Sequence, residues 1–90
     1  MVQNTPAQRA KATIRYKLIT DTIKKGLARL EADLAYGKAL LKNSTTKDDA
    51  EARNIIKATT SDIAKTKRAV AIDQQENEAA VRRGEINKFW

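Results

Sequence analysis

The chain has 90 residues, enough for one small domain; 41% of them are hydrophobic, with alanine the commonest, and only 4% are aromatic. It has no cysteine and no histidine, which excludes a disulfide scaffold and removes the commonest metal ligand and general base. The net charge is +7, and the surplus lies in the first half: residues 6–42 hold nine basic and three acidic side chains, residues 47–90 nine and eight. Scarce glycine and proline indicate long helices.

The polar first residues, 1–6, have no apolar stretch of the kind that a signal peptide needs. The longest apolar run, residues 69–72, is far shorter than the roughly 20 residues of a membrane span. We therefore expect a protein that is neither exported by a signal peptide nor transmembrane, located in the cytoplasm or within an assembled particle.

A first helix is predicted over residues 6–42. Thr5 at the N-cap and Gln8 three residues later form a capping box, in which each side chain bonds the backbone N–H of the other residue. Pro6 suits the first helical position because its fixed φ is already helical. Nothing before residue 42 forces the helix to end.

A short loop and a second helix of matched length follow. Residues 43–46 are Asn-Ser-Thr-Thr, the one clear loop signal, and Thr46 can cap a helix over residues 47–83. Gly84 follows two arginines in a typical helix-stop arrangement, which leaves residues 84–90 as a tail. Two helices of roughly 55 Å each, at 1.5 Å per residue, predict an antiparallel hairpin within one domain spanning residues 1–90.

The periodicity predicts that the hairpin is coiled-coil-like. In both helices, seam positions recur at alternating spacings of three and four residues. These positions are Thr13, Tyr16, Thr20, Ile23, Leu27, Leu30, Leu34, Gly37 and Leu41 in the first helix, and Ala52, Ile56, Thr59, Ile63, Thr66, Val70, Asp73, Asn77, Ala80 and Gly84 in the second. Matched lengths predict the cross-helix pairs Leu34–Ile56, Leu27–Ile63 and Thr20–Val70.

Two features of the seam leave alternatives open. The open end of the hairpin, away from the loop, carries polar seam residues. We expect Tyr16 to lie near Asp73 or Asn77 there, or else the two helices to splay apart into water at this end. Residues 59–62, Thr-Thr-Ser-Asp, could cap a new helix and produce a three-helix bundle instead. The heptad pattern runs through residues 59–62 without a phase break, which favours one continuous helix.

The apolar surface points to partners. A lone hairpin buries few large side chains, so we expect a bundle completed by a second copy of the chain or by a larger assembly. Phe89 and Trp90 at the end of the chain are candidate interface anchors, although the tail could fold back instead. The remaining contact residues predicted to point away from the seam are Ile14, Leu18, Tyr36, Ile72 and Ile86.

The residue types argue against catalysis. Ser44 and Ser61 lie near helix starts, where they suit capping, and the carboxylates of Asp73, Glu76 and Glu78 point in different directions on a helical wheel. We therefore predict no enzyme, no metal site and no cofactor. A membrane-surface role is not favoured, because helix pairing already accounts for the apolar seam.

Nucleic acid is the alternative partner. A basic helical surface can lie along a phosphate backbone or face an acidic protein. No aromatic residue interleaves the basic stretch as in a base-stacking platform. We predict a non-enzymatic interaction or assembly module, with a hairpin that binds nucleic acid as the alternative, and the candidate phosphate or acidic-partner contacts are Lys11, Arg15, Lys17, Lys24, Lys25 and Arg29.

Overall fold

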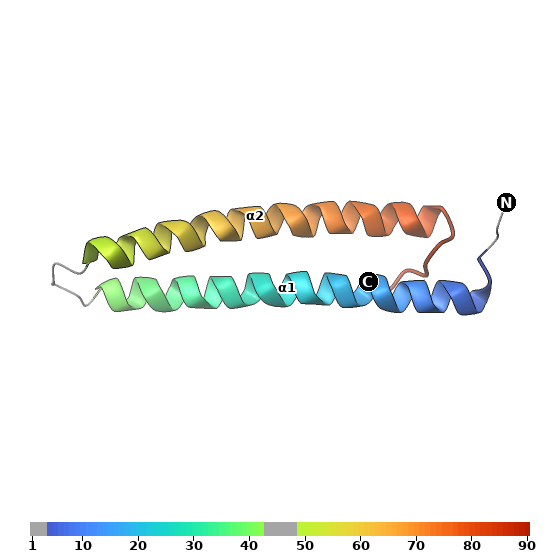
Figure 1. Cartoon of the computed structure of the whole chain (residues 1–90), viewed down its shortest axis with the longest axis horizontal. Coiled ribbons are helices and arrows are strands. Elements are labelled where there is room, and N and C mark those ends of the chain that lie inside the picture. Colours follow the sequence, from blue (N-terminus) through green and yellow to red (C-terminus); the bar gives the residue numbers. More distant parts are fainter. Residues whose placement is uncertain (1–3, 43–48) are drawn as a thin grey trace.

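The computed structural model describes residues 4–42 and 49–90. Two long helices, α1 (Pro6–Lys42) and α2 (Asp49–Arg82), run antiparallel and side by side (Figure 1). They form a rod with extents of 65 × 16 × 15 Å. The predicted all-α two-helix hairpin is therefore confirmed.

The helix ends follow the predicted capping chemistry. The Thr5 N–H donates to Gln8 Oε1 at 3.0 Å and the Gln8 N–H to Thr5 Oγ1 at 3.2 Å, which is the expected capping box. The loop and the Thr46 cap fall in residues 43–48, which lie outside the described part of the chain. Helix α2 is described from Asp49, two residues after the predicted start, and ends one residue before the predicted end.

The C-terminal end of α2 is closed by a glycine in the left-handed region. Gly84 has φ of 74°. Its N–H donates to the Val81 carbonyl and the Glu85 N–H donates to the Ala80 carbonyl, both at 3.0 Å. These two bonds are a Schellman motif, which satisfies carbonyls that the helix leaves free and turns the chain back.

We predict opposite effects of the same substitution at two glycines. Gly84→Ala lowers the free energy of unfolding by about 1 kcal/mol, because an alanine side chain is strained at positive φ. Gly26→Ala raises it by up to about 1 kcal/mol, because Gly26 is helical and a Cβ there meets nothing within 4 Å. Urea unfolding of dilute protein measures the two changes in the free energy of unfolding. A loss of stability at both positions would contradict the placement of Gly26 within the helix beside open space.

The core is the predicted seam. Four seam side chains are buried, namely Thr20, Ile63, Asn77 and Ala80, and the other seam positions except Gly84 are partly buried. Threonines occupy seam positions at little polar cost, because Thr13 Oγ1 donates to the Arg9 carbonyl at 2.6 Å and Thr66 Oγ1 to the Asp62 carbonyl at 2.8 Å.

Helix α2 continues unbroken through residues 59–62, so the three-helix alternative is wrong. The hydroxyls that could have capped a new helix bond backwards within α2 instead. Thr59 Oγ1 donates to the Ile55 carbonyl at 2.9 Å and Thr60 Oγ1 to the Ile56 carbonyl at 2.8 Å.

The predicted register is wrong by three residues. A Cβ on Gly37 would lie 3.5 Å from Ile56 Cγ1, and the Thr20 hydroxyl bonds Asp73. The pairs predicted from matched lengths were Leu34–Ile56 and Thr20–Val70. Both observed partners are three residues further along, because the polar residues Thr20 and Asp73 pair with each other.

The open end of the hairpin is closed by the tail. After Gly84 the chain returns alongside α1 (Figure 1), and the Asn87 N–H donates to Thr13 Oγ1 at 2.9 Å. Ile86 is buried at 3% exposure and Ala80 at 0%. The tail therefore supplies apolar cover that the two helices lack at this end, and the alternative of a splayed, wet end is wrong.

Candidate docking surface

Large apolar side chains gather on one flank of the rod. With the seam at heptad positions a and d, the g positions of two antiparallel helices lie on the same flank, with the c positions beside them. Five apolar side chains that are 55–68% exposed occupy c or g positions. We call them the apolar flank: Ile19, Tyr36 and Leu40 of α1, and Ile55 and Ile72 of α2.

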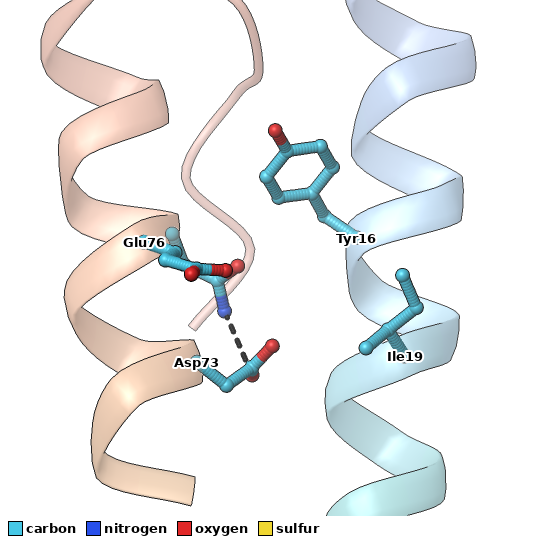
Figure 2. Close-up of a pocket in the computed structure, with 5 residues that line it drawn as sticks. Tyr16, Ile19, Asp73 and Glu76 are labelled. Atoms are coloured by element: carbon cyan, nitrogen blue, oxygen red, sulfur yellow. Dashed lines mark hydrogen bonds between the residues drawn. The ribbon is translucent and has the colours of Figure 1, made fainter. Parts of the chain in front are cut away.

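A hollow beside the seam shows that the g positions of the two helices share one side. Ile19 and Glu76, both at g positions, line it together with Tyr16, Asp73 and Asn77 (Figure 2). Tyr16 therefore lies near both Asp73 and Asn77, as predicted.

A polar triad crosses the seam next to this hollow. The Thr20 hydroxyl donates to Asp73 Oδ2 and accepts a 2.9 Å bond from Asn77 Nδ2, which also donates to Asp73 Oδ2 at 3.2 Å. Asn77 is 1% and Thr20 4% exposed. Because both buried side chains find partners, the triad ties α1 to α2 in one register. The sequence indicated a polar seam but, with the register displaced, did not pair Thr20 with Asp73.

The structure places the predicted apolar contact residues on three different parts of the hairpin. Tyr36 and Ile72 belong to the apolar flank. Ile14 and Leu18 are each 60% exposed, but they occupy heptad positions b and f on the outer surface of α1. Ile86 was expected on an outward surface, and this is wrong, because the turn at Gly84 folds it into the hairpin core.

Three members of the flank were missed by the sequence analysis. Ile19, Leu40 and Ile55 sit at g positions beside the seam, so they were not singled out as a surface. The signal was a second stripe of alternating three- and four-residue spacings, through positions c and g, which parallels the seam.

The two terminal aromatics pack on each other. The Phe89 and Trp90 rings are edge-on, with centroids 5.1 Å apart. Phe89 is half-buried, whereas Trp90 is 41% exposed. The tail is thus folded back on its own hairpin, and Trp90 is the more accessible of its two aromatic rings.

The six predicted basic contacts are all exposed but are not gathered together. Lys11 and Lys25 fall at heptad position f, Arg15 and Arg29 at c, and Lys17 and Lys24 at e, which spreads them around the outer arc of α1. The e flank, opposite the apolar flank, instead combines basic residues of both helices. They are Lys17, Lys24 and Lys38 of α1 with Arg53 and Lys67 of α2.

One member of the e flank is already paired. Lys17 Nζ donates to Asp21 Oδ2 at 2.7 Å, and this bond lowers the pKa of Asp21 below its ordinary value of 3.8. The folded-state pKa is depressed, so the stabilisation is present above pH 3.8 and is lost as the pH falls through the lowered value. Both side chains are well exposed, so solvent screening keeps the effect small.

Within residues 4–42 and 49–90, no group of three or more Asp or Glu side chains is arranged to hold a metal ion. In the same part of the chain, neither helix is long and apolar enough to cross a membrane. Comparison with known proteins gave no match among family models, curated proteins or solved structures.

Proposed function

We propose that this chain is a non-enzymatic docking module, a small helical subunit that binds another protein chain through its apolar flank. The observation that carries the proposal is the alignment of five large, exposed apolar side chains on one side of the rod. Single exposed apolar residues are ordinary on protein surfaces, but several on one flank shared by two helices are typical of an interface.

The energetics of a hairpin support the same proposal. Only Ile63, Ala80 and Ile86 are buried apolar residues among those that the structure describes. A core of this size gives little stabilisation against the entropy of ordering two long helices. Covering the apolar flank with a partner adds the burial that the single chain lacks.

Site-specific photo-crosslinking in the cells of origin tests this function. A photoreactive amino acid replaces Tyr36, Leu40 or Ile72 on the apolar flank, and Lys24 or Lys67 on the opposite flank as the matched control. We expect the three apolar-flank positions to give the same adduct and the control positions to give none. Equal labelling from both flanks, or no protein adduct from the apolar flank, would count against the proposal.

The e flank supports a second candidate, the binding of nucleic acid through phosphate contacts. Heptad register places Lys24 level with Lys67 and Lys38 level with Arg53, so basic side chains of both helices share one flank of the rod. Lys24→Gln with Lys67→Gln should then weaken a gel shift at low salt, whereas Lys11→Gln with Lys65→Gln should weaken it less. Equal weakening would indicate unspecific attraction to the net charge.

A further inference from the structure

The apolar flank is divided by a band of charge, which we call the belt. Arg29 and Asp33 of α1 and Asp62 and Lys65 of α2 occupy c or g positions, and all four are exposed. None of them has an ion-pair partner among the residues that the structure describes. On one side of the belt lie Ile19 and Ile72, and on the other side Tyr36, Leu40 and Ile55.

Within one chain the belt sets like charges level with each other. Gly37 is next to Ile56 and Thr20 is bonded to Asp73. The same register brings Asp33 level with Asp62, and Arg29 level with Lys65. Like charges on neighbouring helices repel, so the packing of α1 against α2 gains nothing from this arrangement. A partner that set opposite charges over the belt would turn this repulsion into attraction.

We propose that the partner on this flank is a second copy of the chain, packed antiparallel about a two-fold axis that crosses the belt. This inference rests on the docking function proposed above and names its partner. An axis in the plane of the interface, perpendicular to the rod, stacks α1 on α1 and α2 on α2 with reversed direction. Arg29 then faces Asp33 of the second copy, and Lys65 faces its Asp62.

The same axis pairs four of the five apolar-flank side chains without further adjustment, and Ile19 lies outside the overlap. On α1, Tyr36 faces Gly26 of the second copy, where a side chain meets nothing within 4 Å in the hairpin, and Leu40 faces Thr22. On α2 the pairs are Ile72–Ile55 and Ala69–Ala58. Each pair joins a c position to a g position, as in a second heptad seam. Glu51 and Glu76 meet only at the rim, where solvent screens their repulsion.

The contact is offset from the centre of the rod. It overlaps residues 20–42 of the two α1 helices, roughly 35 Å at 1.5 Å per residue, over a width of about 16 Å. Covering this strip on both copies removes on the order of 1,000–1,500 Å² from water, which reaches the size of specific interfaces. The ends that carry the tail extend beyond the overlap.

Charge swapping across the belt tests the proposal. Asp33→Arg with Asp62→Lys makes the belt wholly basic, and Arg29→Asp with Lys65→Asp makes it wholly acidic. At about 50 µM the native chain should sediment at twice its 10.0 kDa mass. Each variant alone should dissociate with a Kd raised roughly tenfold or more, and an equimolar mixture of the two should form a 1:1 dimer.

Glu31→Arg with Glu78→Lys is the matched control for the basic belt, because it makes the same change in net charge with one substitution on each helix, away from the apolar flank. The control variant should remain a dimer. A monomeric native chain, a basic-belt variant that still dimerises, or a mixture without heterodimer would each overturn the proposal. If the native chain is monomeric while Tyr36 crosslinks to a different protein, the docking function stands and the self-pairing fails.

Discussion

Replacing Ile63 by alanine should lower the free energy of unfolding by about 2–4 kcal/mol. Ile63 is a seam residue at the centre of α2 and only 7% exposed, one of three buried apolar residues in the described chain. The substitution removes methyl groups from a thin core that has few other contacts to compensate. Urea unfolding followed by helical circular dichroism measures the loss.

Ile14→Ala is the control for this effect. Ile14 is the same residue type in a helix, but it is 60% exposed and lies away from both the seam and the apolar flank. We expect its replacement to change the free energy of unfolding by no more than about 0.5 kcal/mol at the same protein concentration. Equal losses from the two substitutions would mean that the seam is not the core.

Asn77→Ala should cost about 1–3 kcal/mol, because it leaves the buried Thr20 hydroxyl and the Asp73 carboxylate without their amide donor. Replacing all three residues of the triad by apolar ones should not lower the free energy of unfolding. In Thr20→Val, Asp73→Leu, Asn77→Leu no polar group remains to be satisfied, so we expect a stability at or above that of the native chain.

We expect the apolar triple variant to have a less well-defined alignment of α1 against α2. A polar pair in an apolar seam is satisfied in one alignment only, whereas leucines and valines pack in several. Paired spin labels on the two helices should therefore give one distance in the native chain and a broader distribution in the apolar variant. If the apolar variant is less stable than Asn77→Ala and keeps one sharp distance, the triad does not set the register.

Much of the fold could be predicted because it depends on local and periodic signals. The capping box at Thr5 and the stop at Gly84 are short-range chemistry, and both are found as expected. The heptad spacing identified the buried positions within the two helices, including Thr20 and Asn77. Continuity of the heptad phase also correctly favoured one long α2 over a break at residues 59–62.

The errors concern long-range geometry, which sequence spacing does not fix. Lengths alone place two antiparallel helices only to within about one turn, and the choice between alignments comes from side-chain pairs such as Thr20 with Asp73. The burial of Ile86 depends on how the chain turns after positive-φ Gly84. The apolar flank was only partly predicted, because its α1 and α2 members become neighbours only once the register is known.

The hairpin and its apolar flank depend on one chain folding back in the register that puts Gly37 beside Ile56. The chain has no cysteine, so two can be introduced cleanly. With Gly37→Cys and Ile56→Cys, mild oxidation should rapidly form a disulfide within single molecules, because a Cβ at residue 37 lies against the Ile56 side chain. Links only between molecules, or faster closure of a Leu34→Cys, Ile56→Cys pair, would contradict this register and the apolar flank built on it.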